Sequence, residues 1–351
     1  MIRLIIDRVL LGIASILLVS ALITTIIFYA PVDPARLSFG QRSDEETIQL
    51  YKKKYYLDQP CFVQVFRFFE DLSPVQFIHA KDSRLNDYQF TKIIQISSHF
   101  LIFKKPYFRK SYVNGQNVWP QIVEAIPGTL VLALASIIIS IIVGMILGFI
   151  SALKFGSWWD KSILIFCSMS YAIPSYVSAV IVGVIFAYVL GDWTGLQLQG
   201  SLWDYDDLGE QKLYLSHLIL PVFALGIRPV SMIAQMTRAA TLDVLEADYV
   251  RTARSKGINM VKLIYKHVLP NSINPILTTI SSWFASLLTG SFFIEYIFNY
   301  KGLGLLTINA LNSFDVPLIS GCCIITVSIF VIINFVTDLA YAFFDPRIKL
   351  N

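Results

Sequence analysis

The chain has 351 residues, of which 55% are hydrophobic and only 15% are charged, and its formal net charge is +4. Soluble domains carry about 25% charged residues, so the composition excludes an ordinary soluble domain and indicates a membrane protein. The four cysteines show no spacing typical of a disulfide framework or a metal site.

Five runs of the sequence contain no charged residue over at least 22 positions. A hydrocarbon core about 30 Å thick is crossed by about 20 apolar residues, so each run predicts a membrane-spanning helix. A sixth span is predicted over 213–237, where His217 and Arg228 interrupt an otherwise apolar stretch. The five charge-free runs are 9–30, 125–153, 162–191, 271–294 and 316–337.

The first run follows Arg3 and Arg8, a pattern that signal peptides and first membrane helices share. Because the run is longer than the apolar region of a signal peptide and no small-residue cleavage site follows, we interpret 1–30 as a transmembrane helix. The segment 31–119 is predicted to form an external loop or cap. Within it, a helix is expected over 43–57 with Ser43 as its N-cap. The remainder, 120–351, is predicted to be a five-helix core.

Basic residues in short loops indicate the cytoplasmic side of a membrane protein. With six spans, the basic segments 154–161 and 238–270 lie on the same side as both termini, which is therefore predicted to be cytoplasmic. The opposite loop, 192–212, holds five acidic residues against a single lysine. The segment 31–119 carries 13 Lys and Arg residues, but long loops cross membranes largely regardless of charge.

Within the spans, one cation, two glycines and a proline lead to further hypotheses. A cation at membrane depth is costly and normally faces a bundle interior or water, so Arg228 either lines a translocation path or pairs structurally. The spacing of Gly144 and Gly148 predicts a close helix contact. Pro174 predicts a kink in the third span.

The segment 241–271 is basic, is broken by Gly257 and ends soon after Pro270. Gly257 suits a left-handed helix C-cap and Asn259 suits the N-cap of a following helix, so the pattern predicts two short helices, the second ended by Pro270. The residues alone leave two interpretations equal. The segment is either an amphipathic element at an anionic lipid surface or a docking element for a cytoplasmic partner.

No motif for nucleotide hydrolysis is present, because the sequence lacks G-x-x-x-x-G-K-[ST]. It also lacks H-E-x-x-H and a G-x-S-x-G with supporting residues. The four histidines are scattered along the chain. The sequence therefore predicts no catalytic residue.

Several motifs carry a resemblance to a known family. DYVRTARSKG at 248–257 differs at one position from the D-Y-V-R-T-A-R-A-K-G that is typical of the dipeptide/oligopeptide branch of ABC-importer permeases. Nearly the whole chain resembles this branch, and it is similar to the subunit type with the larger first outer loop. Lys301 stands where proline is common, and 74–105 has no counterpart. Four further motifs also match: LDQP at 57–60, HLILP at 217–221, EYIFNYKGLG at 295–304 and DPRIK at 345–349.

The resemblance implies an all-α integral membrane protein with the type I ABC importer permease architecture, which has six transmembrane helices and here an extended external loop after the first. It implies a permease subunit in the bacterial cytoplasmic membrane. With a second homologous permease, this subunit would form a path for peptides delivered by an extracytoplasmic solute-binding protein. Two ATP-binding subunits would use ATP and Mg, while this chain would bind no cofactor or metal.

The same resemblance assigns candidate residues through the motifs. In the coupling loop, 241–271, cations would pair with acids on the ATPase while the apolar residues would pack. A translocation path or gate would involve Glu295, Gly302 and Gly304 of the EYIFNYKGLG motif. Arg228 joins them as a candidate because of its charge at membrane depth and not through a motif. The ATPase-coupling residues would be Val250, Arg251, Thr252, Ala253, Arg254, Lys256, Gly257 and Pro270.

Two alternatives stay open. The first is the same importer class with a nickel complex, glutathione or an oligosaccharide as cargo. The second is another class altogether, either a stand-alone secondary transporter or a membrane scaffold.

Overall fold

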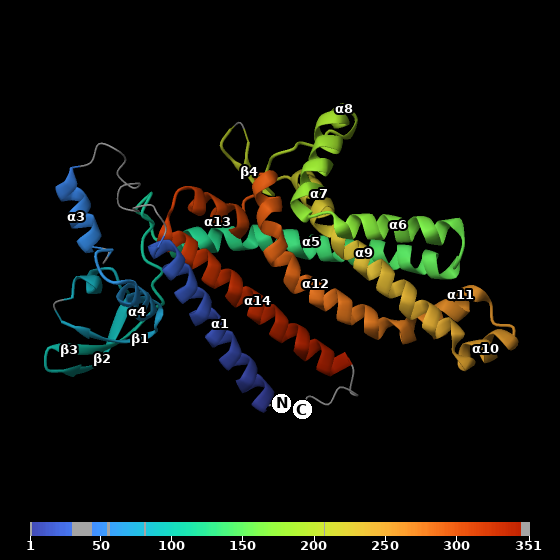
Figure 1. Cartoon of the computed structure of the whole chain (residues 1–351), viewed down its shortest axis with the longest axis horizontal. Coiled ribbons are helices and arrows are strands. Elements are labelled where there is room, and N and C mark those ends of the chain that lie inside the picture. The colour runs from blue at the N-terminus through green and yellow to red at the C-terminus, as the bar shows by residue number, and fades with distance from the viewer. Residues whose placement is uncertain (1, 30–43, 55–56, 81, 207, 345–351) are drawn as a thin grey trace. The chain divides into compact units, whose positions relative to one another are not determined.

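The computed structural model describes residues 2–29, 44–54, 57–80, 82–206 and 208–344. In these ranges the chain is mostly helical, as predicted, and it also contains short strands (Figure 1). Contacts within the chain divide it into two units. The N-terminal unit comprises Ile2–Glu124 with Leu306–Ser328, and the core unit comprises Ala125–Leu305 with the chain from Ile329 onward.

The N-terminal unit combines helices with a small antiparallel sheet. α3 carries Glu45 and Glu46 in its first turn, where carboxylates complement the helix dipole. This confirms the predicted helix, whose proposed N-cap, Ser43, lies outside the described residues. The elements are α1 (Ile2–Phe28), α3 (Glu45–Lys54), α4 (Cys61–Leu72), β1 (Val75–His79), the 3₁₀ turn η1 (Ser83–Asn86), β2 (Phe90–Ile96) and β3 (His99–Lys104).

The strands lie in the segment 74–105, for which the family motifs have no counterpart. They form a sheet in the order β1-β3-β2, with Ile78 opposite Phe100. These two residues pack with Tyr88 and Ile102 in a small core. Buried and exposed residues alternate along β1 and β3, which is the period of a strand with one buried face. Strands were not among the elements predicted for this segment.

A buried ionic cluster joins α4 to the strands. The Asp71 carboxylate accepts hydrogen bonds from the Tyr88 hydroxyl and from Arg109 Nε, the latter at 2.7 Å. Lys104 Nζ donates to the Asp71 backbone carbonyl and lies 4.5 Å from the centroid of the Tyr88 ring. Because the ammonium group loses its hydration here, burial lowers the pKa of Lys104 from 10.5 to about 8.

The core unit is built around long helices that carry its main hydrophobic core. α5 begins, and α13 and α14 lie partly, in the N-terminal unit. The remaining elements are α5 (Val118–Leu153), α6 (Trp158–Ala172), α7 (Ser175–Gly183), the π-helical segment η2 (Val184–Val189), α8 (Gly191–Thr194), β4 (Trp203–Tyr205), β5 (Gln211–Leu213), α9 (Ser216–Glu246), α10 (Asp248–Ser255), α11 (Met260–Leu263), the π-helical segment η3 (Ile264–Val268), α12 (Leu269–Ile297), α13 (Leu303–Asn312) and α14 (Val316–Phe344).

Each predicted span coincides with a helix or a bent pair of helices. Among the described residues, three helices are long and apolar enough to cross a membrane, and two bent pairs would raise the number to five. α1 matches the first predicted span and contains the shorter apolar stretch Leu10–Ile23.

The third predicted span is broken rather than kinked. α6 and the helix formed by α7 and η2 meet at an angle of 108°. Ile173 is extended, with φ −76° and ψ 127°, as the residue before a proline prefers to be. Pro174 then precedes α7, where its missing N–H costs no helical hydrogen bond. The prediction of a kink therefore underestimated the bend.

Close packing of α5 on α9 follows the predicted glycine spacing. A Cβ atom on Gly144 would lie 2.9 Å from the Ile233 side chain, and one on Gly148 would lie 2.5 Å from the Ala234 carbonyl oxygen. The two glycines therefore let the helices approach each other, as predicted.

Candidate functional site

The basic segment folds as two consecutive short helices. α10 ends at Ser255, and Gly257 adopts a left-handed φ of 75° before α11 begins at Met260. Because other residues rarely adopt this conformation, Gly257 permits the turn between the helices. The predicted break is confirmed at that residue.

α10 has one buried face and one exposed face. Val250 and Ala253 are buried with Leu263 of α11 in a small apolar cluster, against which Val244 and Leu245 of α9 pack. The side chains of Val250 and Ala253 therefore pack α10 against α9 and α11 of the same chain. The exposed residues of the helix and the turn are Asp248, Tyr249, Arg251, Thr252, Arg254, Ser255, Lys256 and Gly257.

Pro270 does not end the second short helix, so that expectation was wrong. α11 continues through η3 directly into α12, and Pro270 lies in the first turn of α12. A proline removes one backbone donor and crowds the preceding turn, and the wider π-helical turn relieves that crowding. The Asn271 side chain donates to the His267 carbonyl at 2.7 Å, so this carbonyl has a partner.

Glu295 caps the N-terminus of α13 from inside the core unit. Its carboxylate is fully buried, and Oε1 accepts hydrogen bonds from Thr129 Oγ1 and Ser291 Oγ, both at 2.8 Å. Oε2 accepts from the backbone N–H groups of Gly304 at 2.6 Å and Leu305 at 3.2 Å. A carboxylate at a helix N-terminus satisfies free donors and complements the helix dipole.

The glycines of the EYIFNYKGLG motif lie against this carboxylate. A Cβ atom on Gly302 would come within 2.5 Å of Glu295 Oε2 and 2.6 Å of Thr129 Oγ1. One on Gly304 would come within 2.4 Å of Phe292 Cα. Glu295, Gly302 and Gly304 therefore form one contact group that positions the start of α13.

Lys301 follows Glu295 in the same motif and stands where the resembled motif commonly has proline. Its contacts give a reason for this difference. Its backbone N–H donates to Ser201 Oγ at 2.8 Å, a bond that proline could not make. Its ammonium lies 3.3 Å from Asp204 in β4. Partial burial opposes ionisation of Asp204, but the Tyr205 N–H and Lys301 together hold the pKa of this carboxyl below its usual range.

Arg228 belongs to a separate cluster. Its guanidinium carbon lies 5.3 Å from the centroid of the Tyr171 ring in α6 and 5.9 Å from that of Trp283 in α12. Arg228 Nε is buried without a hydrogen-bond partner, and the described residues offer Arg228 no ion pair. Aromatic rings stabilise a cation without neutralising it, so the charge remains available to a partner.

A groove of about 380 Å³ adjoins this cluster between α9 and α12. Met232 and Met236 follow Arg228 at intervals of four, so the three residues share one face of α9. Trp283 lines both the groove and the Arg228 cluster. The other lining residues are Pro275, Thr278, Thr279 and Ser282.

A buried ion pair ties α6 to α9. Asp160 accepts from Arg238 Nε at 2.7 Å and Nη2 at 3.0 Å, and it also accepts from Ser151 Oγ and the Gly156 N–H. Sequence reasoning treated Arg238 only as evidence of orientation. The signal that could have revealed the pair was Asp160, an isolated acid at the edge of a charge-free run.

Apart from Pro270 in the first turn of α12, the predicted residues fall into three groups: α10 with the turn after it, the α13 cap and the Arg228 cluster. Sequence reasoning missed the partners Thr129, Ser291, Tyr171 and Trp283, which are ordinary residues of apolar helices. Among the described residues, no three His, Cys, Asp or Glu side chains gather as a metal site would require.

Two protein-family models match this chain. The family model described as "Binding-protein-dependent transport system inner membrane component" matches residues 144–350, and the N-terminal model of the same transport systems matches 1–133. The MetNI methionine ABC transporter, solved in an inward-facing conformation, has a chain of similar fold. Its TM-score is 0.52 at 14% identity, over 65% of this chain and 97% of that one.

Curated relatives match over most of the chain. A di/tripeptide transport system permease protein of Pseudomonas aeruginosa is 32% identical over 256 residues, which are 68% of this chain and 76% of that protein. A putative peptide transport system permease protein of Brucella abortus is 30% identical over the full length of both chains. A dipeptide transport system permease protein of Bacillus subtilis is 28% identical over 96% of this chain and 95% of that protein.

The helical fold and these matches define a multi-pass membrane protein that acts as a transport subunit. Within that class, the chain belongs to the family of binding-protein-dependent transport system inner membrane components, which are permeases of ABC importers.

Proposed function

We propose that the chain is a permease subunit of an ATP-driven peptide importer and forms the translocation path with a second, homologous permease. An extracytoplasmic solute-binding protein delivers the peptide, and two ATP-binding subunits dock on the cytoplasmic side. The observation that carries the proposal is a full-length match to a peptide permease, combined with an exposed basic helix, α10, on an apolar base.

In this proposal α10 is the surface that meets an ATPase subunit. The exposed side chains Arg251, Thr252 and Arg254 of this helix, and Lys256 in the turn after it, face acidic groups on that partner. The buried Val250 and Ala253 transmit a displacement of α10 to α9 and α11, because packed side chains resist independent movement. Gly257 provides the turn, and Pro270 lies where the helix pair continues into α12.

The translocation path runs along the α9–α12 groove. Arg228, which has no ion-pair partner among the described side chains, meets a carboxylate of the peptide there. Met232 and Met236 have flexible, polarisable side chains that adapt to peptides of varied sequence. Glu295, Gly302 and Gly304 fix the start of α13, and α13 acts as a gate of the path.

The division of labour within the complex follows from this assignment. Partner subunits bind and hydrolyse ATP with Mg²⁺, and this chain supplies no ATPase site. Both termini lie in the cytoplasm of a bacterium, with 1–30 as the first transmembrane helix. The segment 31–119 lies outside the cytoplasmic membrane, and 120–351 forms the five-helix core with the coupling loop 241–271.

Purification of the tagged complex together with its binding protein tests the proposal. Mass spectrometry is expected to find a second permease, two ATPase copies and a peptide retained by the binding protein. A retained nickel complex, glutathione or oligosaccharide would keep the importer class and replace the cargo. A chain that transports alone would be a secondary transporter, and a chain found alone without transport would be a scaffold.

Charge reversal on α10 tests the docking surface. Arg251→Glu combined with Lys256→Glu is expected to remove the ATPase subunits from the purified complex while leaving the second permease bound. Lys53→Glu, an equal kind of change on an exposed residue of α3, serves as the control. Equal retention of ATPase subunits by both variants would place the docking surface elsewhere.

A further inference from the structure

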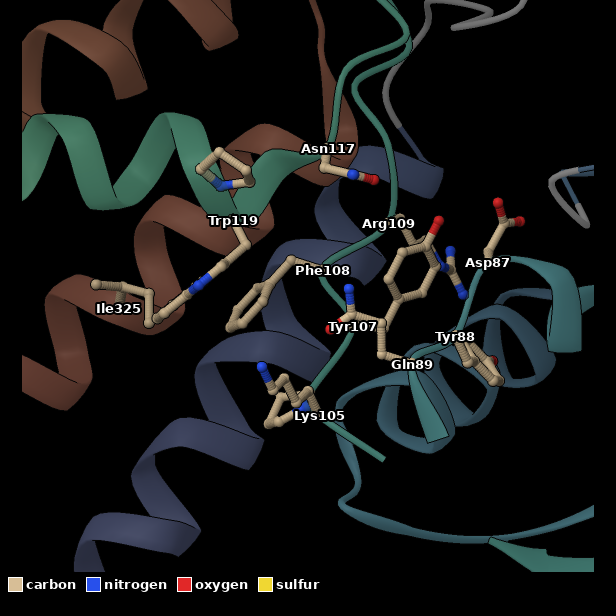
Figure 2. A pocket seen from close by; sticks show the side chains of 12 residues that line it. Asp87, Tyr88, Gln89, Lys105, Tyr107, Phe108, Arg109, Asn117, Trp119 and Ile325 are labelled. Carbon is tan, nitrogen blue, oxygen red and sulfur yellow. The ribbon is translucent and has the colours of Figure 1, made fainter. Parts of the chain in front are cut away.

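A cavity of about 490 Å³ lies within the N-terminal unit, and none of the residues of the α10 helix, the α13 cap or the Arg228 cluster line it. Its walls come from the segments 87–89 and 105–109, from the beginning of α5 and from Ile325 of α14 (Figure 2). The cavity volume falls in the range of small-molecule sites. Nothing in the proposed transport function uses it.

The charges around this cavity leave one uncompensated cation. Asp87 pairs with Lys110 at 2.8 Å, and Arg109 pairs with the buried Asp71 at 2.7 Å. Lys105 is exposed, and its Nζ makes no ion pair or hydrogen bond within the described part of the chain. Because Asp87 and Arg109 are neutralised by their partners, the ammonium of Lys105 is the charge that remains at the cavity, and it favours an anionic ligand. The side-chain amides of Gln89 and Asn117 add exposed donors to the lining.

The other side of the cavity is apolar and lies at the start of a membrane span. Phe108 stacks on Trp119, with ring centroids 5.4 Å apart, and Trp119 is 47% exposed at the second residue of α5. Val123, one turn further along the same face, is 44% exposed. α5 and α14 both qualify as spans by length and composition. A partly exposed tryptophan at the end of a span is typical of the headgroup region of a bilayer.

We propose that this cavity binds the phosphate headgroup of a membrane phospholipid. Lys105 Nζ and the Asn117 amide donate to the phosphate oxygens. An acyl chain of the same lipid follows the apolar face of Trp119 and Val123 on α5, beside Ile325. A soluble phosphate would use only the polar side of the cavity, so the continuous apolar face identifies a lipid as the occupant.

Photolabelling of the intact complex tests the site. The complex is placed in vesicles of phosphatidylglycerol and phosphatidylethanolamine that contain a phospholipid with a photoactivatable group next to its phosphate. Peptide mapping is expected to find the label within 105–120. Lys105→Glu is expected to reduce that label about tenfold, since each basic residue contributes measurably to the binding of anionic lipid headgroups. Lys53→Glu, outside the cavity, is expected to leave it unchanged.

Two further arms keep the result interpretable. If Lys105→Glu lowers the melting temperature, Asn117→Asp places an acid at the exposed rim instead and is expected to reduce the label in the same way. Adding inorganic phosphate or glycerol phosphate as a competitor of the photolabel shows whether the site binds a free anion or a lipid. The proposal would be overturned if these soluble anions abolished the labelling of 105–120, or if a peptide displaced the lipid. Equal labelling of the Lys105→Glu variant and the unmodified complex would also overturn it.

Discussion

Gly302 leaves no room for a methyl group beside the Glu295 carboxylate, since a Cβ atom would lie 2.5 Å from Oε2. We expect Gly302→Ala to displace the group that caps α13. The cost should be about 1–3 kcal/mol in the free energy of unfolding, with reduced peptide uptake. Thermal melting of the purified complex measures the first effect, and a transport assay measures the second.

Gly290 in α12 provides a matched control for this prediction. A Cβ atom there would meet only Leu225 Cδ1, at the ordinary contact distance of 3.8 Å. Because alanine is favoured over glycine inside a helix, Gly290→Ala should leave the melting temperature unchanged or slightly raised. Identical behaviour of the two variants would contradict the role assigned to Gly302.

The buried Lys104 makes the stability of the N-terminal unit depend on pH. Its pKa is about 8 in the folded unit and 10.5 in the unfolded chain, so between these values the unfolded chain binds more protons. The free energy of unfolding therefore rises with pH, by about 1–2 kcal/mol from about pH 8 to about pH 9.5. Hydrogen exchange of the β3 amides measures this rise.

Lys104→Met removes the titrating group and is expected to flatten the rise, whereas Lys92→Met on the exposed part of β2 should preserve it. Burial also raises the pKa of Tyr88. Tyrosine ionisation in the unfolded chain would therefore lower stability above about pH 10, and the measurement stays below that value. A flat profile in the unmodified protein would show that Lys104 carries no such penalty.

The sequence identified single residues where a local motif marks them, and it failed where a partner lies far along the chain. Glu295, Gly302 and Gly304 were found because they stand in one short motif. Thr129, which donates to the Glu295 carboxylate, lies 166 positions away in an apolar helix. A pattern with the period of a helix predicts which face is apolar, but it contains no information about which distant hydroxyl will meet a buried carboxylate.

At the scale of elements, the pair of Asp160 and Arg238 fixes α6 against α9 with both side chains largely buried. Asp160→Asn leaves the guanidinium without its carboxylate, so we expect a loss of about 3–5 kcal/mol in the free energy of unfolding. Adding Arg238→Met removes the uncompensated charge and should recover part of that loss. Thermal melting of both single variants and the double variant measures the coupling, and strictly additive effects would contradict it.

Length and charge predicted the three to five candidate spans found among the described residues, because a bilayer imposes a minimum number of apolar residues on any helix that crosses it. The length and charge of an apolar run do not predict how its helix bends. Pro174 was read as a kink and lies at a 108° break, and Pro270 was read as a stop and lies within a continuous helix. A proline disrupts the local hydrogen-bond ladder, and the surrounding packing decides whether the chain breaks or widens into a π-helical turn.

The strands of 74–105 show a different failure at this scale. Their alternation of buried and exposed residues does not follow polarity, because Gln76 and Lys104 are buried while Phe77 and Phe103 are exposed. The composition of the whole chain also favoured helices. Short strands gain their stability from partners across the sheet and from helix packing. Their formation therefore depends on tertiary contacts such as those of Asp71 with Tyr88 and Arg109.

For the whole molecule, the distribution of basic residues predicts which helix ends face the cytoplasm. In a Cys61→Ser background, Lys53→Cys in α3 should react with a membrane-impermeant maleimide in intact cells. Lys154→Cys, in the loop after α5, should react only after the cells are made permeable. Labelling of Lys154→Cys in intact cells would reverse the proposed orientation.

The contact between Lys301 and Ser201 limits how this protein could be stabilised by engineering. Designers often replace a residue with the one common in its family, and the motif that this chain resembles commonly has proline at position 301. Lys301→Pro would delete the N–H that Ser201 Oγ accepts at 2.8 Å and the ammonium that pairs with Asp204. A change that suits the relatives would thus weaken this chain, and a consensus design would have to vary residues 201, 204 and 301 together.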